Sequence, residues 1–331
     1  MRKPSDMPRR TALRLLAGSA GLPLLGCQLS SSEGSTQATS DETTKSMPDT
    51  TRAMPQKGEM RRRAIPSSGE MLPVVGLGTW QQFDVGEAES KRTPLKKVLR
   101  QMVELGGSVV DSSPMYGRAE RVVGELSAEL GLTDEIFAAT KVWTRGKQDG
   151  IRQMKSSIEK MNSRPMDLMQ VHNLMDWQTH LETLRTWKEE ERIRYTGVTH
   201  YVTSAFDELA SVITETGVDF VQLPYSIRTR QAEERLLPLA ADNDIAVIAN
   251  QPYEGGRLFG AVDDRELPSW AQSFAETWGQ FFLKFILARP EVTCVIPGTS
   301  DPEHLRDNMR AGYGALPDAD TRRRMAEYVD Q

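Results

Sequence analysis

The sequence predicts a (β/α)8 barrel with a short N-terminal β-hairpin that closes the floor of the barrel. Eight short apolar segments have the length of buried strands, and helical patterns separate them, which favours a parallel sheet. All of these elements fall within residues 61–331, a span that suits the roughly 250 residues typical of such barrels. A doubly wound open sheet is the alternative, and it is disfavoured because no complete G-x-G-x-x-G fingerprint follows the first strand.

The predicted strands are bounded by turn residues. Pro66-Ser67-Ser68-Gly69 is a turn sequence between two short extended segments, residues 61–65 and 70–72, which together predict the hairpin. The eight strands expected after it are Pro73–Gly78, Ser108–Asp111, Ile136–Lys141, Asp167–His172, Tyr195–Thr199, Phe220–Leu223, Ile245–Ala249 and Val292–Ile296.

The predicted helices follow the i, i+3, i+4, i+7 spacing of apolar residues. The first begins with Thr93 as the N-cap and Pro94 at the first helical position, and it ends at Gly106. The second ends at Gly131. The later helices are expected at Thr179–Glu190, Ser204–Thr216, Ala232–Asp242, Pro268–Ala288, from Asp301 onward and from Asp318 to Asp330.

Composition excludes several classes of function. The chain has 331 residues, 38% hydrophobic and 26% charged, as globular proteins have. Its net charge of −5 gives no electrostatic reason to expect nucleic acid as a partner. The two cysteines, Cys27 and Cys294, form no C-x-x-C pair, and no two histidines have metal-ligand spacing, so we predict no metal site. We expect a monomer.

Residues 1–27 predict an export signal. Basic residues precede an apolar stretch, Leu13–Gly26, that is too short to span a bilayer. The pair Arg9-Arg10 resembles a twin-arginine signal, and Leu24-Leu25-Gly26-Cys27 resembles a bacterial lipobox, in which the cysteine is acylated. These resemblances imply a protein exported to the periplasmic side of a bacterial envelope, anchored by a lipid on Cys27. A frayed basic tail with a chance cysteine is the alternative.

Residues 28–60 predict a disordered tether between this signal and the barrel at 61–331. The segment is rich in Ser, Thr, Gly and acidic residues and has few large apolar ones. Such a composition buries too little apolar surface to offset the entropy of ordering the chain. The tether would separate the barrel from a lipid anchor.

Four ionisable residues stand at or just after three consecutive predicted strands: Asp111, Tyr116, Lys141 and His172. Because the carboxyl ends of parallel strands meet at one rim, these side chains are expected to converge. The segments that carry them, VVDSSPMYG, AATKV and LMQVHN, resemble the aldo-keto reductase superfamily, which places an Asp, a Tyr, a Lys and a His in this order. The resemblance runs from about Arg61 to the C-terminus.

The resemblance implies reduction of a small aldehyde or ketone by hydride from a nicotinamide cofactor. Tyr116 is the expected general acid, and a nearby Lys141 cation should lower the pKa of its phenol. Asp111 would hold the Lys141 ammonium, and His172 would orient the substrate oxygen or share the proton relay. Each residue alone could be structural, and the set together predicts catalysis.

The resemblance also implies the cofactor site. It assigns contacts near the nicotinamide to Gly78, Thr79 and Trp80, carboxamide contacts to Thr199, His200 and Gln222, the pyrophosphate loop to Gln251, Tyr253 and Gly255-Gly256, and a phosphate site to Thr299, His304, Arg306 and Asn308.

The chain departs from the family pattern at three positions. Asn250 stands where the family often has an aromatic residue stacked on the nicotinamide, so Tyr225 or Tyr253 would have to substitute. Gly298 and His304 stand where many members have Lys and Arg for a 2′-phosphate. NADP is the predicted cofactor, with NAD as the alternative because few cationic partners for that phosphate are evident.

The substrate pocket is expected to be open and lined partly by Trp80, Trp143 and Trp177, so that varied carbonyls fit. His180 is expected at the surface. A different class of function is a redox sensor or partner protein that binds the cofactor on the same barrel without significant turnover. A third is a barrel that processes sugars or polyols without any cofactor.

Overall fold

The computed structural model describes residues 58–331. The predicted export signal, Cys27 and nearly all of the predicted tether lie outside the described residues and stay predictions. Met60, at the end of the predicted tether, is already buried among the core side chains. Across residues 58–331, no helix is both long and apolar enough to cross a membrane.

Eight parallel strands form one sheet in the order β10-β9-β8-β7-β6-β5-β4-β3. Bridges from Val75 to Val295 and from Gly78 to Gly298 join its two edges, which closes the barrel. The predicted (β/α)8 fold is therefore confirmed. The strands are β3 (Leu77–Gly78), β4 (Val109–Asp111), β5 (Phe137–Val142), β6 (Met166–His172), β7 (Ile193–Thr199), β8 (Phe220–Pro224), β9 (Ala246–Asn250) and β10 (Val292–Val295).

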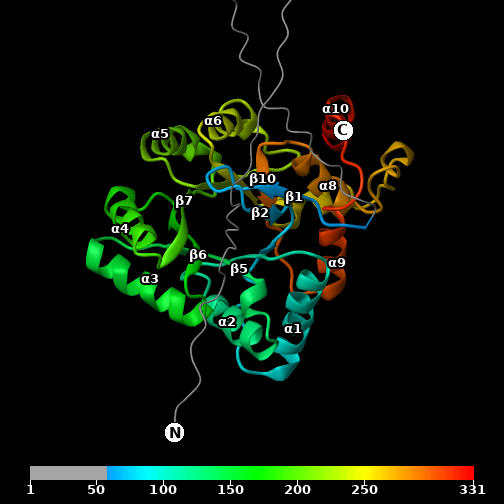
Figure 1. The fold of residues 1–331 in the computed structure, drawn as a ribbon. Helices are drawn as coiled ribbons and strands as arrows, with labels where there is room; N and C mark the ends of the chain where they lie inside the picture. The colour runs from blue at the N-terminus through cyan, green and yellow to red at the C-terminus, as the bar shows by residue number, and fades with distance from the viewer. Residues whose placement is uncertain (1–57) are drawn as a thin grey trace, which may run out of the picture. The chain divides into compact units, whose positions relative to one another are not determined.

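Helices surround the strands, and Figure 1 shows α1 to α6 following one another around the barrel, with α10 between α6 and α8. Each contributes buried apolar residues to the hydrophobic core, as the spacing of apolar residues predicts for the longer helices. They are α1 (Glu89–Glu104), α2 (Ala119–Glu129), α3 (Lys147–Met161), α4 (Trp177–Glu189), α5 (Phe206–Thr216), α6 (Leu236–Asp242), α7 (Arg257–Gly260), α8 (Trp278–Leu287), α9 (Pro302–Arg310) and α10 (Ala319–Val329).

Three predicted helix starts are wrong. Helix α6 begins at Leu236 instead of Ala232, because Arg235 has a non-helical backbone that separates this helix from the short turn at Gln231–Glu233. Helix α1 begins at Glu89, so Pro94 lies inside it, and the Thr93 hydroxyl donates to the Glu89 carboxylate at 2.9 Å instead of capping the helix. Helix α8 begins at Trp278, ten residues after the predicted start at Pro268. The reason is local: the Thr277 side chain accepts the Gln280 N–H and makes a new N-cap.

The predicted hairpin is present and closes the N-terminal end of the barrel. β1 (Arg62–Ala64) pairs antiparallel with β2 (Met71–Pro73), and Pro73 belongs to this hairpin instead of the first barrel strand. Ile65 and Leu72 are buried in the same apolar cluster as the lower interior side chains of the barrel. The Arg63 guanidinium donates to the Arg289 carbonyl at 2.7 Å, just before β10.

The interior of the barrel is apolar near the hairpin and polar at the other end. Side chains alternate along a strand, so every second residue points inward. The apolar interior layer comprises Val109, Phe137, Ala139, Leu168, Tyr195, Phe220, Ala246, Ile248, Cys294 and Ile296. The polar residues further along the same inward faces are Asp111, Lys141, Gln170, Thr199, Gln222 and Asn250. The strand period thus places the polar groups together at the carboxyl end.

Candidate active site

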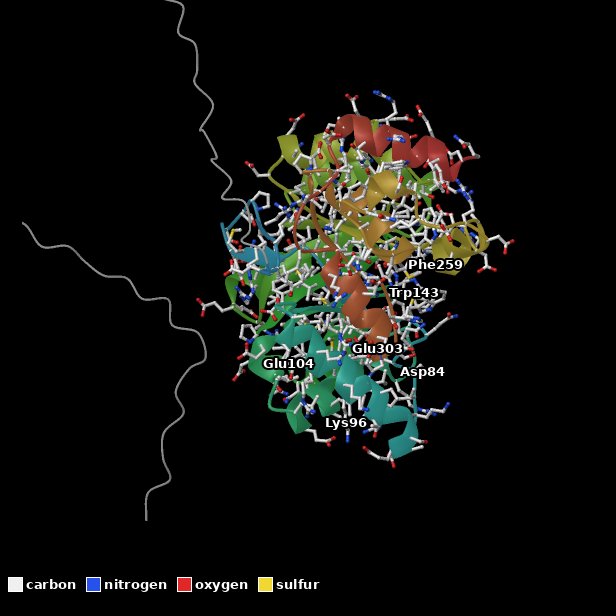
Figure 2. The ribbon with its side chains drawn as sticks, turned by 90° about the vertical axis from the view of Figure 1, so that its right-hand side faces the viewer. Asp84, Lys96, Glu104, Trp143, Phe259 and Glu303 are labelled. Atoms are coloured by element: carbon white, nitrogen blue, oxygen red, sulfur yellow. The ribbon has the colours of Figure 1, made fainter. Side chains whose placement is uncertain are left out.

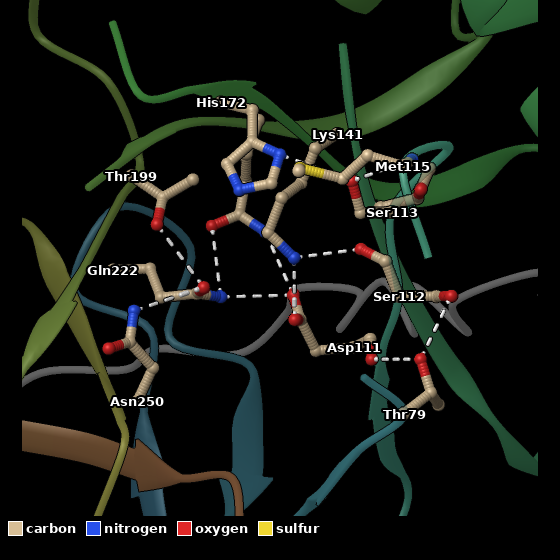
Figure 3. A network of polar contacts seen from close by, with 12 residues as sticks. Thr79, Asp111, Ser112, Ser113, Met115, Lys141, His172, Thr199, Gln222 and Asn250 are labelled. Atoms are coloured by element: carbon tan, nitrogen blue, oxygen red, sulfur yellow. Dashed lines mark hydrogen bonds and ion pairs between the residues drawn. The ribbon is translucent and has the colours of Figure 1, made fainter. Parts of the chain in front are cut away.

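The site is built on a buried ion pair. Lys141 Nζ on β5 lies 2.6 Å from Asp111 Oδ2 at the end of β4, and it also donates to the Ser112 carbonyl at 2.7 Å. Figure 3 shows this pair at the centre of a polar network. Tyr116, in the loop between β4 and α2, has its ring centroid 5.2 Å from Lys141 Nζ. The structure therefore brings together three of the predicted catalytic residues.

Two amides complete the surroundings of the buried carboxylate. Asp111 Oδ1 accepts a hydrogen bond from Gln222 Nε2 at 2.9 Å and another from Gln170 Nε2 at 3.1 Å. Counting Lys141, three donors replace the water that Asp111 loses on burial, and an ionised group inside a barrel needs such partners. Gln170 and Gln222 thus hold the carboxylate that in turn holds the lysine.

Burial and charge set the protonation of the lysine and the tyrosine. Burial alone lowers the pKa of Lys141, but the charges of Asp111 and Tyr116 outweigh burial and raise that pKa above its ordinary value. Burial raises the pKa of Tyr116, while Lys141 opposes the rise and Asp111 adds to it. Lys141 thus lowers the pKa of the phenol, as predicted, but burial outweighs this effect and the net pKa of Tyr116 is raised. The phenol keeps its proton, which a general acid requires.

His172 ends β6 and faces the same group. Its ring is edge-on to Tyr116, with centroids 6.1 Å apart, and its Nδ1 lies 3.1 Å from the Ser113 hydroxyl. Burial lowers the pKa of His172 to about 3, and the nearby Lys141 and His200 add to this lowering. At neutral pH the ring is an uncharged imidazole.

The residues predicted after the first barrel strand divide into buried and exposed. Gly78 pairs with Asp111, and a Cβ there would lie 2.9 Å from the Ile296 carbonyl, so only glycine fits this closing seam. Thr79 Oγ1 lies 3.0 Å from the Asp111 carbonyl and 2.9 Å from Ser112 Oγ. Trp80 is 56% exposed. Gly78 and Thr79 therefore support the loop of the site, and Trp80 stands open on its rim.

A second polar group lies at the ends of β7, β8 and β9. Thr199 Oγ1 donates to Gln222 Oε1 at 3.2 Å, and Asn250 Nδ2 approaches the same oxygen at 3.4 Å. His200 Nδ1 accepts two main-chain N–H groups, from Tyr201 at 3.0 Å and Val202 at 3.2 Å, which leaves its proton on Nε2. The predicted carboxamide residues therefore gather in one place, although the Gln222 amide is already bonded within the protein.

The loop after β9 borders a hollow. Gln251 Nε2 donates to the Tyr201 carbonyl at 3.0 Å, which ties this loop to the one after β7. The hollow has a volume of about 210 Å³ and is lined by Tyr201, Val202, Thr203, Pro224, Thr229, Gln251, Glu254 and Arg257. A predicted cofactor residue, Gln251, thus opens onto a polar cavity.

The predicted phosphate residues after β10 differ in exposure. Thr299 Oγ1 is buried and accepts the Asp301 N–H at 3.0 Å, just before Asp301 caps α9. Asn308 Oδ1 accepts the Tyr253 hydroxyl at 2.5 Å. His304 is exposed, and the Arg306 guanidinium pairs with the Glu303 carboxylate. Of these four predicted phosphate residues, only His304 and Arg306 therefore reach towards solvent.

Among residues 58–331, no group of three or more His, Cys, Asp or Glu side chains is gathered to hold a metal ion. The site consists instead of an ion pair, a phenol and a neutral imidazole at the mouth of a barrel. The sequence of this chain matches the model of the Aldo/keto reductase family over residues 74–324.

The chain belongs to the aldo/keto reductase family.

Characterised relatives span most of this aldo/keto reductase. Methylglyoxal reductase YeaE of Escherichia coli (strain K12) is 28% identical over 258 residues, which cover 75% of this chain and 89% of the relative. The NADP-dependent D-sorbitol-6-phosphate dehydrogenase of Malus domestica is 26% identical over 294 residues, covering 77% and 90%. The NADH-specific methylglyoxal reductase of E. coli is 23% identical over 337 residues, covering 82% and 100%.

Solved structures of the family share the fold. An aldo/keto reductase from Klebsiella pneumoniae, determined in complex with NADP and acetate, superposes with a TM-score of 0.68 at 24% identity, over 82% of this chain and 95% of the other. An aldo-keto reductase from Bacillus halodurans in its holo form gives a TM-score of 0.65 at 22% identity, over 82% and 96%.

Neither tyrosine considered for stacking in this aldo/keto reductase is free to do so. Tyr225 is fully buried, and its hydroxyl donates to Glu233 at 2.8 Å. Tyr253 packs against Phe259, with ring centroids 4.9 Å apart, and its hydroxyl is bound to Asn308. Both rings serve the packing of the helical layer, so Asn250 stands at the end of β9 without an aromatic substitute from these two positions.

The prediction that His180 lies at the surface is wrong. His180 is completely buried on α4, and its Nε2 lies 2.7 Å from the Thr144 carbonyl. A Cβ on Gly150 of α3 would lie 2.5 Å from the imidazole, so the two helices meet closely at this glycine. Trp177, predicted to line the pocket, is half-buried at the start of α4 and packs against the hydrophobic core.

Two side chains of the site, Gln170 and Ser113, were not predicted from the sequence. Gln170 precedes His172 by two positions on a strand, so the period of two places both side chains on the inward face, and this signal was available. Ser113, which contacts His172, lies in a loop where no periodicity indicates direction. Only the folded chain identifies it.

Proposed function

We propose that this protein reduces the carbonyl group of an aldehyde or ketone to an alcohol, with Tyr116 as the general acid and a nicotinamide cofactor as the hydride source. The observation that carries this proposal is the contact of three groups in one buried place: the Lys141–Asp111 ion pair, the protonated phenol of Tyr116 and the neutral imidazole of His172. An ion pair buried only for stability would not require a phenol and an imidazole at its open side.

The residues around the mouth fit a nicotinamide dinucleotide. Asn250 Oδ1 is buried and has no hydrogen-bond partner among the described residues, and the same holds for Asn173 Oδ1. Amide oxygens of this kind accept N–H donors such as a carboxamide provides. The Nε2–H of His200 can donate to a carboxamide oxygen. The hollow beside Gln251 leaves room for further polar groups of the cofactor.

The chemistry follows from where protons are held. The cofactor supplies a hydride to the carbonyl carbon when it is bound. As the carbon–oxygen double bond becomes single, the oxygen gains negative charge and takes the proton from the Tyr116 hydroxyl. The Lys141 ammonium, held by Asp111, then stabilises the phenolate that remains. Such acid catalysis contributes about 10²–10⁴ to the rate.

We infer that the substrates are small carbonyl compounds and that the mouth of the barrel accepts varied groups attached to the carbonyl carbon. Exposed large apolar side chains follow five of the barrel strands: Trp80, Met115, Trp143 and Tyr201 in loops, and Phe259 on the short helix α7. Figure 2 labels Trp143 and Phe259 at the edge of the molecule opposite the hairpin. Because two relatives are methylglyoxal reductases, methylglyoxal is the first substrate to test.

NADP is the proposed cofactor and NAD the alternative. Relatives of both kinds exist, since one is NADP-dependent and another NADH-specific. Among the predicted phosphate residues, Arg306 and His304 are the ones that can carry a positive charge, although Glu303 pairs with Arg306. The ratio of kcat/KM for NADPH and NADH decides between them.

The test is the loss of NADPH or NADH absorbance with methylglyoxal and a panel of aldehydes and ketones. Tyr116→Phe should lower kcat about 10²- to 10⁴-fold while cofactor affinity, measured by fluorescence, stays within about twofold. Tyr313→Phe is the matched control, because the Tyr313 hydroxyl bonds the Leu105 carbonyl away from the site. Tight cofactor binding without turnover in the unaltered protein would instead support the cofactor-binding sensor.

We also propose that residues 1–27 direct export through a twin-arginine signal and that Cys27 carries a lipid on the periplasmic side. Replacing Arg9 and Arg10 by Lys should leave the precursor in the cytoplasm. Cys27→Ala should release the mature protein from the membrane fraction, and an unchanged distribution would refute the anchor. We propose a monomer, for which light scattering of the Cys27→Ala protein should give about the mass of a single chain.

A further inference from the structure

Ser113 connects two of the groups that would act on the substrate. It is completely buried in the loop after β4, and its carbonyl accepts the Tyr116 N–H at 3.0 Å, so its backbone shapes the turn that carries the phenol. Its hydroxyl lies 3.1 Å from Nδ1 of His172. Figure 3 shows Ser113 between the Met115 main chain and the His172 ring.

The protons at this contact can be counted. The Ser113 oxygen accepts the Met115 N–H at 3.4 Å, and the hydroxyl carries a single proton of its own. Among residues 58–331, Nδ1 of His172 is the only acceptor within reach of that proton. If Nδ1 carried the imidazole proton, the buried serine proton would have no acceptor, which is unfavourable.

We propose that Ser113 donates to Nδ1 of His172 and thereby holds the imidazole in the tautomer that carries its proton on Nε2. A neutral imidazole has one N–H and one lone pair, so fixing Nδ1 as an acceptor decides what the other nitrogen presents. Ser113 is in this view a positioning residue that acts through His172.

The consequence for the reaction rests on the proposed function. With its proton on Nε2, His172 donates a hydrogen bond to the carbonyl oxygen and leaves proton transfer to Tyr116. The opposite tautomer would present a lone pair to that oxygen, and the two lone pairs would repel each other. A serine that bonds no substrate atom would therefore determine whether the carbonyl is polarised.

The tautomer can be measured on the resting protein by long-range ¹H–¹⁵N NMR of ¹⁵N-labelled imidazoles. The chain has four histidines, and His172→Gln identifies the signal by its loss. The unaltered protein should show a protonated Nε2 and an unprotonated, hydrogen-bonded Nδ1. Ser113→Ala should give a mixture of tautomers, and Ser113→Thr, which keeps the hydroxyl, should restore the single form. Ser127→Ala is the control, because the Ser127 hydroxyl is also buried but has no partner among the described residues.

Kinetics provide the second readout. Ser113→Ala should lower kcat about 3- to 10-fold, the loss expected for one neutral hydrogen bond, with KM for the cofactor unchanged. Ser113→Thr should recover most of this loss, and Ser127→Ala should show none. A proton found on Nδ1 in the unaltered protein would overturn the proposal even if no variant folds. So would a pure Nε2–H tautomer in Ser113→Ala. Absence of turnover in the unaltered protein would remove the proposed function and leave the tautomer result standing.

Discussion

Breaking the Lys141–Asp111 pair from either side should have unequal effects on stability. Both side chains are almost inaccessible to solvent, at 0% and 3% exposure, and removing one partner of such a buried pair typically destabilises a protein by about 3–5 kcal/mol. In Lys141→Met, however, the Asp111 carboxylate keeps two amide donors, from Gln170 and Gln222. We therefore expect about 3 kcal/mol for this variant.

Asp111→Asn should be the more damaging change. The Lys141 ammonium would keep only the Ser112 carbonyl as a partner, and no carboxylate would remain in contact with it. We expect about 4–5 kcal/mol, the upper end of the range for a buried charge left without its partner. The double variant Asp111→Asn/Lys141→Met should lose less than the sum of the two single losses, because no charge remains buried.

Urea denaturation measures these free energies of unfolding. Lys147→Met is the control, since Lys147 and Glu182 are paired at 3.0 Å but are 50% and 69% exposed, and such pairs contribute about 0–1 kcal/mol. The reasoning is refuted if the single losses simply add in the double variant, or if Lys141→Met proves as costly as Asp111→Asn. Neither result would depend on activity.

Three further predictions concern stability. The pKa of His172 falls to about 3 through burial among Lys141, His200, Tyr116 and Trp143. The neutral imidazole therefore stabilises the fold above pH 6.5 by at most about 5 kcal/mol, and this contribution should be lost as the pH falls through 3. His172→Gln should flatten that part of the stability profile. Burial lowers the pKa of Lys284 to about 8, with Arg61 adding to the fall and Glu276 opposing it, and its only hydrogen bonds among the described residues go to the Tyr313 and Ala315 carbonyls. The stability of the fold should therefore rise between pH 8 and 10.5, by at most about 3 kcal/mol. Lys284→Met should abolish this rise in pH-dependent melts. Thr277→Ala should lower the free energy of unfolding in urea by about 1 kcal/mol, because it removes the N-cap of α8. Thr93→Ala should lower it by less than about 0.5 kcal/mol, because Thr93 lies inside α1 and caps nothing.

Among predicted N-caps, local sequence patterns were right where the capping side chain bonds the first turn of its own helix. Asp301 and Asp318 cap α9 and α10 as expected, since each side chain accepts a main-chain N–H of its own first turn. Thr93 has the same capping chemistry, but the preceding residues continue the helix and its hydroxyl bonds Glu89 instead. A threonine can cap a helix only where the residues before it are not helical, and the sequence around Thr93 does not show that they are.

The alternation of strands and helices was sufficient to predict the barrel, the hairpin and the convergence of Asp111, Tyr116, Lys141 and His172. This follows because parallel strands joined by helices place all their carboxyl ends at one side. The alternation of side chains along each strand also predicts which polar residues face the barrel interior, Gln170 included, once it is followed from residue to residue.

The sequence by itself determined the fold class and the set of reactive side chains, since both follow from periodicity along the chain. Only the tertiary structure decided the protonation and the partners of those groups. Burial, not the nearby Lys141, governs the pKa of Tyr116, Gln222 bonds Asp111, and Ser113 faces His172 across a loop. Desolvation and contacts between loops depend on distances in space, and residues that are 59 and 111 positions apart carry no such information in their local sequence.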